Sequence, residues 1–184
     1  MKNIATNSLN YVGTVIVYKY SGKKKTELTR VHNAGNSPLF SFMTDCLLGN
    51  FDTAKLKLPN KIMLLNEYKE DNTAVLEARS AGFIPLVSAP EKVINSQDDG
   101  SAVAYSFIVQ YDQIIGNFNR IALYSRGAED MYNYSAICEI SDEDRLNNMS
   151  LSSALVIEWQ LSITNKPVET PGVSGYTAKE EIKE

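Results

Sequence analysis

The chain has 184 residues, of which 43% are hydrophobic and 22% are charged, as in an ordinary globular domain with or without an extension. The formal net charge of -4 argues against direct nucleic-acid contact, because sequence-independent binding needs an excess of Lys and Arg to displace counterions from phosphate. No apolar run approaches the roughly 20 residues of a membrane span, and none follows Lys2 as in a secretory signal. We therefore expect a soluble protein that is made in a cytoplasm and has no membrane partner.

The N-terminal part predicts a β-hairpin with a cationic tip. Residues 11–20 are rich in aromatic and β-branched side chains, which suit a strand, and residues 26–31 alternate in the same way. Gly22 and three consecutive lysines at positions 23–25 lie between them. Like charges at a hairpin tip discourage edge pairing, so we expect these lysines to be solvated. The alternative is a docking patch for an acidic neighbour or for nucleic acid.

One α-helix is expected over residues 38–48. Pro38 suits the first helical position because its missing N–H would be unpaired there, and Gly49 can adopt the left-handed conformation that ends a helix. Apolar side chains recur between them at helical spacing, which predicts that one stripe packs across a sheet and places Cys46 inside. The stripe consists of Leu39, Phe40, Met43, Cys46 and Leu47.

The middle of the chain gives weaker signals. Residues 61–66 are predicted to form a short buried strand, and residues 67–72 a polar loop. Residues 83–87 contain Pro85, which has no backbone N–H and therefore favours an edge strand.

Strand patterns dominate the second half. Residues 103–111, 119–125, 134–140 and 154–163 are each predicted to be strands, and the first and last of them alternate most regularly. Many strands with short turns and one inserted helix predict a mainly β fold, an antiparallel β-sandwich or flattened barrel of about seven to eight strands. The side chains expected in the core are Val103, Tyr105, Phe107, Val109 and Tyr111 of the first strand and Leu155, Ile157, Trp159, Leu161 and Ile163 of the last.

The composition changes after Asn165. Residues 166–184 contain two prolines, two glycines, many charges and no apolar face, which is typical of a segment that does not fold alone. We expect a β-sandwich domain over residues 1–165 and an extended C-terminal arm over residues 166–184. At about 3.3 Å per residue the arm could span roughly 60 Å, enough to lie across a neighbouring subunit. The alternative is that it packs back on its own domain.

The few reactive side chains do not form a recognisable site. His32 has no second histidine for a zinc site, and we expect it to be exposed or satisfied by a hydrogen bond. Cys46 and Cys138 lack CxxC spacing and are interpreted as buried apolar side chains. The acidic turns at 98–99 and 142–144 do not match a calcium loop and are interpreted as solvated. We expect no enzyme, no cofactor, no metal and no small-molecule substrate.

The closing strands carry a family resemblance. Residues 120–125, 136–140 and 155–165, the last of which reads Leu-Val-Ile-Glu-Trp-Gln-Leu-Ser-Ile-Thr-Asn, resemble β-rich structural proteins of tailed-bacteriophage virions. Such proteins lie in the tail, neck or baseplate, where a strand of this kind often closes a small sandwich and terminal arms connect one subunit to the next. The resemblance implies no catalytic residue.

The resemblance and the arm together predict a non-enzymatic assembly protein. We expect a homo-oligomeric virion protein, made in the host bacterial cytoplasm, that contacts copies of itself and other virion proteins through sheet edges and the arm. The arm residues expected to contact a neighbouring subunit are Pro167, Val168, Tyr176 and Ile182.

The alternative function is that of a glycan- or surface-ligand-binding β-sandwich module at a tail or fibre tip. Ten tyrosines and one tryptophan could furnish a sugar-binding surface, because an aromatic ring combines a large apolar area with a polar tip. This alternative predicts several exposed tyrosines in one concave patch, whereas assembly predicts tyrosines in the core or at subunit contacts.

Overall fold

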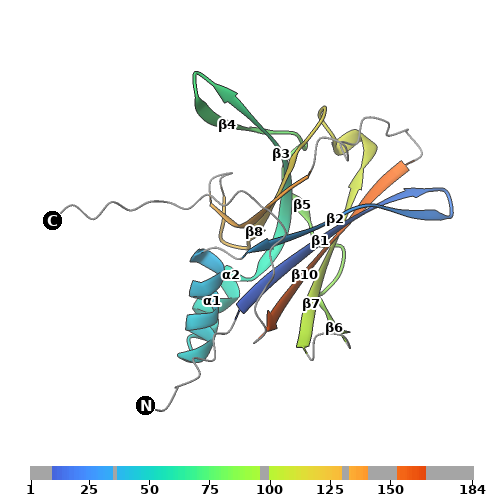
Figure 1. Cartoon of the computed structure of the whole chain (residues 1–184). Coiled ribbons are helices and arrows are strands. Elements are labelled where there is room, and N and C mark those ends of the chain that lie inside the picture. The colour runs from blue at the N-terminus through green and yellow to red at the C-terminus, as the bar shows by residue number, and fades with distance from the viewer. Residues whose placement is uncertain (1–9, 35–36, 96–99, 130–132, 141–152, 165–184) are drawn as a thin grey trace, which may run out of the picture.

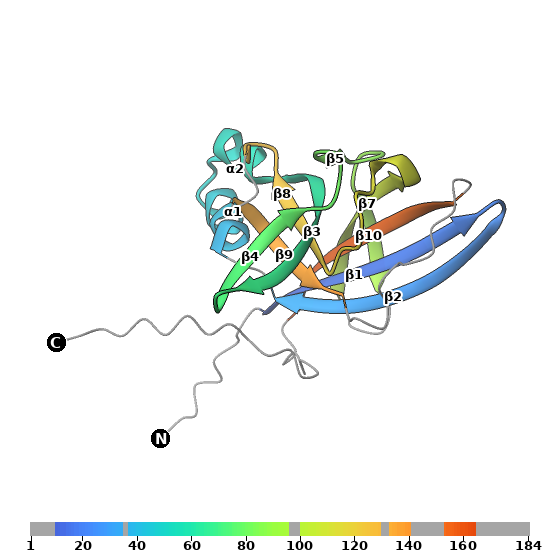
Figure 2. The same ribbon diagram turned by 90° about the horizontal axis from the view of Figure 1, so that it is seen from above.

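The computed structural model describes residues 10–34, 37–95, 100–129, 133–140 and 153–164. These residues form two antiparallel sheets of five strands each, packed as a β-sandwich, with two helices beside the second sheet (Figures 1 and 2). The mainly β fold class is therefore confirmed. The described residues contain ten strands and two α-helices, where the sequence predicted seven or eight strands and one helix.

The first sheet, sheet A, is built from strands that lie far apart in the sequence. Its order is β2 (Lys24–Ala34), β1 (Asn10–Ser21), β10 (Ser153–Thr164), β7 (Gly100–Gln110) and β6 (Glu91–Asn95). The predicted last strand, β10, takes the central place and pairs with β1 from Asn10 opposite Thr164 to Ser21 opposite Ser153. The predicted N-terminal hairpin is also confirmed, and its tip lies at one end of the sandwich (Figure 2).

The second sheet, sheet B, corrects two predictions. Its order is β4 (Thr73–Ala78), β3 (Pro59–Glu70), β8 (Arg120–Ser125) and β9 (Tyr134–Glu139), with β5 (Ile84–Pro85) also paired to β3. The predicted polar loop at 67–72 is wrong, because β3 continues to Glu70 and a tight turn leads into β4. The predicted edge strand at 83–87 shrinks to two paired residues, in which Pro85 stands opposite Lys61.

The core between the sheets follows the predicted alternation. Leu155, Ile157, Trp159 and Leu161 of β10 are all buried, and Trp159 is completely so. Along β7, Tyr105, Phe107 and Val109 are buried as expected, whereas Val103 and Tyr111 are each 39% exposed. Val103 pairs with the edge strand β6, and Tyr111 begins a single turn of 3-10 helix, η1 (Tyr111–Gln113), after the strand has ended.

The two helices lie against sheet B on the side away from sheet A (Figure 2). The predicted helix is confirmed as α1 (Ser37–Leu47), but α2 (Phe51–Lys57) falls where the sequence predicted none. Only Ala54 of α2 is buried, so this short helix shows almost no apolar periodicity. A second, smaller apolar cluster lies on the same outer side of sheet B and contains Met63, Leu65, Ala122, Tyr124 and Ala128.

Candidate functional site

Four large apolar side chains of α1, α2 and the turn between them are exposed. Leu47 is 86% exposed, Leu48 68%, Phe51 63% and Leu56 56%. We call these four residues the helical patch. The expectation that Leu47 packs in the core is wrong, because it belongs to the last turn of α1, where the chain already leaves toward α2. Met43 and Cys46 of the same predicted stripe are half-buried, while Leu39 and Phe40 have side chains outside the described part.

A glycine turn fixes the corner that carries the patch. Gly49 has a φ of 75°, in the left-handed region that favours glycine. Its N–H donates to the Cys46 carbonyl at 3.2 Å, and the N–H of Asn50 donates to the Asp45 carbonyl at 2.9 Å. This pair of bonds is a Schellman motif, which caps the end of α1 as the sequence predicted and sets the direction in which α2 begins.

Polar contacts then hold the two helices to each other and to sheet B. The ammonium of Lys57 donates to Ser41 Oγ at 2.7 Å and lies 2.5 Å from Asp45 Oδ2. The N–H of Gly127, in the turn after β8, donates to the Leu56 carbonyl at 3.0 Å. The helical patch is therefore held in place on the sandwich by its neighbours, even though its own side chains face solvent.

A second surface is a shallow groove of about 420 Å³ on the outer face of sheet A. Its side chains are cross-strand neighbours, because Tyr20 stands opposite Ala154 and Val156 stands opposite Ile108. Sequence alternation does not identify the groove, because it separates the two faces of a strand but does not show which strands are neighbours. The groove is lined by Tyr20, Val87, Ser106, Ile108, Gln110, Ala154 and Val156.

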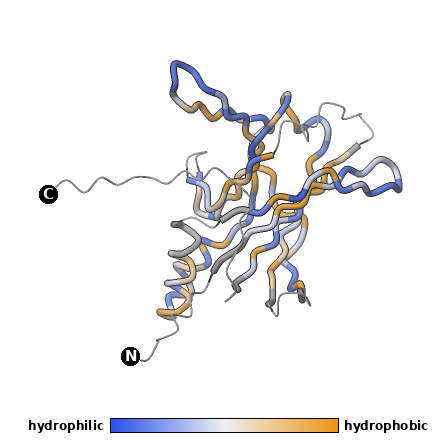
Figure 3. The backbone as a smooth tube through the Cα atoms, in the orientation of Figure 1, coloured by the Kyte–Doolittle hydropathy of each residue, from blue (hydrophilic) through white to orange (hydrophobic). Residues whose placement is uncertain are grey.

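Cations gather at the end of the sandwich that holds the groove. The lysines at positions 23–25 are exposed, as predicted, on a hairpin tip that Figure 3 draws in blue and near-white. Lys25 Nζ lies 3.7 Å from the ring centre of Tyr18 and 5.9 Å from that of Tyr20, close enough for cation–π attraction. Glu27 on the same hairpin forms an ion pair with Arg30, and the hydrogen bonds from that guanidinium lower the pKa of Glu27.

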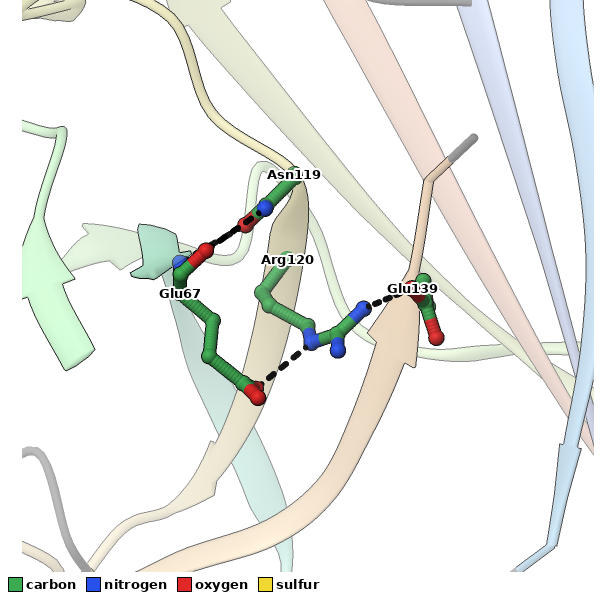
Figure 4. A network of polar contacts seen from close by, with 4 residues as sticks. All are labelled: Glu67, Asn119, Arg120 and Glu139. Atoms are coloured by element: carbon green, nitrogen blue, oxygen red, sulfur yellow. Dashed lines mark hydrogen bonds and ion pairs between the residues drawn. The ribbon is translucent and has the colours of Figure 1, made fainter. Parts of the chain in front are cut away.

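A partly buried charge network joins three strands of sheet B (Figure 4). Arg120 Nε donates to Glu67 Oε2 at 2.9 Å, and Arg120 Nη1 forms an ion pair with Glu139 Oε1 at 2.8 Å. The Asn119 side chain bonds the backbone N–H and carbonyl of Glu67 at 2.7 and 2.9 Å. Burial lowers the pKa of Arg120, but its carboxylate partners outweigh burial and raise it. Both carboxylates pair with the arginine, so the network connects β3, β8 and β9.

The remaining predicted residues can be placed as follows. His32 is exposed and shares a 3.0 Å hydrogen bond with Thr14 Oγ1, as expected. Cys138 is buried as expected, whereas Cys46 is half-buried. The contact residues expected in the arm, Pro167, Val168, Tyr176 and Ile182, lie outside the described residues. So do the acidic turns at 98–99 and 142–144.

Across the described ranges, no three His, Cys, Asp or Glu side chains come together in a group able to hold a metal ion. Neither described helix has the length and apolar character that a membrane-crossing helix needs. No protein-family model matches the chain, and comparisons with curated proteins and with solved structures find no match either. The interpretation of function therefore depends on the helical patch, the groove and the sequence of the arm.

Proposed function

We propose that this chain is a non-enzymatic structural protein of a tailed-phage virion, located in the tail, neck or baseplate, and that it acts through repeated contacts between copies. The observation that carries the proposal is the helical patch, in which four large apolar side chains between positions 47 and 56 are each more than half exposed. Exposed apolar groups gathered in one place are typical of protein–protein contacts.

The energetics favour a contact between two copies of the patch. Fully burying one Leu or Phe side chain contributes about 1.5 to 3 kcal/mol, so even partial burial of four per copy offsets much of the entropy lost on association. A two-fold contact presents the same surface from both sides, so the four residues of one copy can pack on the four of another. The glycine cap and the Lys57 contacts order the backbone of this surface before association, which lowers the entropy cost of binding.

The resemblance of β10 to the closing strands of virion proteins supports the same proposal. The arm at residues 166–184 is then the second contact, laid across a neighbouring subunit or another virion protein. Both contacts repeat from copy to copy, as assembly into a symmetric particle requires.

The test is self-association of the full chain. Replacing Leu47 and Phe51 with Ser removes apolar area from the patch, and we expect the weight-average mass in sedimentation to fall toward that of the monomer. The matched control replaces Tyr68 and Ile115, which are 41% and 52% exposed outside the patch, with Ser. This control should associate like the unmodified chain. Equal association of both variants would contradict the proposal.

Glycan binding is the second candidate function. It is favoured by Tyr20, whose side chain lines the groove beside Ser106 and Gln110, where polar groups could bond a sugar hydroxyl. Assembly is preferred because Tyr105 and Tyr124 are buried and Tyr20 is the one tyrosine among the described residues that lines the groove. An oligosaccharide array probed with the labelled chain tests this candidate: binding that Tyr20→Ala abolishes would support it, and an array without signal would count against it.

A further inference from the structure

Strand β4 leaves one side of its backbone open at the edge of sheet B. Among the described residues it pairs only with β3, as the last strand in the order of the sheet. The two-residue turn after Glu70 makes Glu70 and Thr73 a hydrogen-bonded pair, and from there alternate residues of β4 bond β3. The backbone N–H and carbonyl groups of Ala74, Leu76 and Ala78 therefore face outward.

The open edge ends just after Ala78. Ile115 N–H donates to the Arg79 carbonyl at 2.8 Å, and Ala81 N–H donates to the Gln113 carbonyl at 2.9 Å. The loop before β8 is thus bonded to the chain from Arg79 onward, which leaves β4 itself as the stretch that can accept a further strand. Figure 1 shows the far end of the hairpin of β3 and β4 standing clear of the rest of the sandwich, where a partner can approach it.

The strand β4 lacks the features that normally keep an edge strand from pairing. Charges, prolines and bulges serve this purpose. The edge strands of sheet A carry such charges, in Lys24 and Lys25 of β2 and in Glu91 and Lys92 of β6. In contrast, β4 reads Thr-Ala-Val-Leu-Glu-Ala, with a single charge and no proline, and its register with β3 shows no bulge. An edge of this kind is suited to pair with another strand.

We propose that β4 pairs with its equivalent in a second copy, antiparallel and around a two-fold axis at Val75; this inference goes beyond the helical patch and does not depend on a place in a virion. In this register, Ala74 of each copy stands opposite Leu76 of the other, so their outward backbone groups bond each other. Thr73 stands opposite Glu77 of the other copy, which keeps each strand within the open edge of its partner. Moving the axis toward the end of β4 would bring the turn of one copy against the loop before β8 of the other.

The side chains along this seam match those of a second copy. Val75 meets its own equivalent across the axis, and Leu76 stands beside Ala74 on the other face, so apolar groups lie opposite apolar groups on both faces. Asp71 of one copy falls level with Arg79 of the other, which brings opposite charges together, and no like charges stand directly opposite each other. The match occurs twice, once on each side of the axis, as only a second copy of this chain provides.

The edge contact gives each copy a second neighbour. The helical patch and β4 are separate surfaces, and a two-fold contact at each of them joins one copy to two others. Where the patch associates as proposed above, copies then extend into a ring or a row instead of stopping at a dimer.

Disulfide trapping between full-length chains tests the pairing and its register. All chains carry Cys46→Ser, and Cys138 is buried away from oxidant. Val75→Cys lies on the axis, where the Cα atoms of a non-hydrogen-bonded pair are about 4.5 Å apart, within the span of a disulfide. Thr73→Cys is the matched control, because it lies four positions out of register, about 13 Å from its own equivalent. We expect Val75→Cys to form dimers about tenfold or more faster than Thr73→Cys, and Thr73→Cys mixed with Glu77→Cys to form mixed dimers as fast as Val75→Cys.

A proline at the edge provides a second variant. Ala74→Pro removes an outward N–H that does not bond β3, so the edge strand tolerates it, whereas Ala74→Ser keeps this N–H and is its control. We expect Ala74→Pro to slow the trapping of Val75→Cys about tenfold and Ala74→Ser to leave it unchanged. Equal unfolding midpoints of the two variants show that the sheet is kept, and the comparison of Val75→Cys with Thr73→Cys decides without the proline.

The other outcomes decide as follows. Equal trapping of Val75→Cys and Thr73→Cys would overturn the inference, and so would trapping that a folded Ala74→Pro chain does not slow. Trapping should persist when Leu47→Ser and Phe51→Ser remove apolar area from the helical patch, and its loss there would overturn the edge as a contact of its own. Self-association through the patch without trapping at Val75→Cys contradicts this inference alone and leaves the proposed function in place.

Discussion

At the scale of single residues, the buried thiol of Cys138 makes stability depend on pH. Burial raises the pKa of Cys138 to about 12, whereas an ordinary thiol has a pKa near 9.0. Above pH 9 the thiol therefore ionises in the unfolded chain but stays neutral in the folded one. The stability that it contributes is complete below pH 9 and is lost progressively as the pH rises toward 12.

The prediction compares the chain with its Cys138→Ala variant. Above pH 9, the unfolding free energy of the unmodified chain should fall relative to that of the variant by about 1 kcal/mol per pH unit, because the variant lacks the ionising group. Urea unfolding under reducing conditions at about pH 8 and pH 10.5 measures this difference, and the subtraction removes the titration of Lys and Tyr. A difference that stays constant across that range would contradict a buried neutral thiol.

Periodicity predicted well which residues of a long strand are buried. Trp159 and its neighbours two positions away on β10 are buried because one face of a strand between two layers must be apolar. The same reasoning failed for Leu47, because a helical stripe shows which side of a helix is apolar but not how far along the helix a covering surface extends. Exposure at the end of an element depends on its neighbours in three dimensions.

At the scale of elements, the turn between β3 and β4 consists of two residues whose backbone lies in the left-handed region, which is unfavourable for most side chains. Asp71 has a φ of 49° and Asn72 a φ of 63°, as a two-residue hairpin turn requires. Asn and Asp tolerate this region better than other residues, and a β-branched residue does not. We expect Asn72→Val to lower the unfolding free energy by about 1 to 2 kcal/mol and Asn72→Gly to leave it equal or slightly higher.

Thr73→Val is the control for this turn. Thr73 is the exposed first residue of β4, in extended backbone, so the same β-branched side chain should change stability by less than about 0.5 kcal/mol there. Denaturant unfolding of Asn72→Val, Asn72→Gly and Thr73→Val compares their unfolding free energies. Equal losses at positions 72 and 73 would show that the left-handed backbone carries no cost.

The sequence did not predict two of the elements, the hairpin of β3 and β4 and the helix α2. The hairpin of β3 and β4 looks like a loop because its far end carries charges and its turn lacks glycine, so only cross-strand pairing identifies it. The helix α2 looks like a loop because it buries one small side chain and depends on Lys57 and Gly127 for its position. Local patterns could not predict either, since the hairpin depends on cross-strand pairing and α2 on contacts with other elements.

At the scale of the whole molecule, the class of fold was predictable but the assignment of strands to sheets was not. Strand β10 pairs with β1 and β7, whereas β8 and β9, which precede it, belong to the other sheet. The groove depends on that assignment, because Tyr20, Ile108 and Val156 become neighbours only when β1, β7 and β10 share one sheet. Alternation alone predicts that these residues are outside the core, but not that they lie together.

The arm is the part of the chain whose removal should separate folding from assembly. Both apolar clusters lie within residues 10–164, so deleting residues 166–184 should leave the midpoint of unfolding nearly unchanged. We expect the deletion to lower self-association in sedimentation, because it removes the arm contact while the helical patch remains. A full-length chain with the same arm composition in scrambled order is the control. If it associates like the unmodified chain, the arm contact does not depend on the position of Ile182. A loss of folding on deletion would show instead that the arm packs on its own domain.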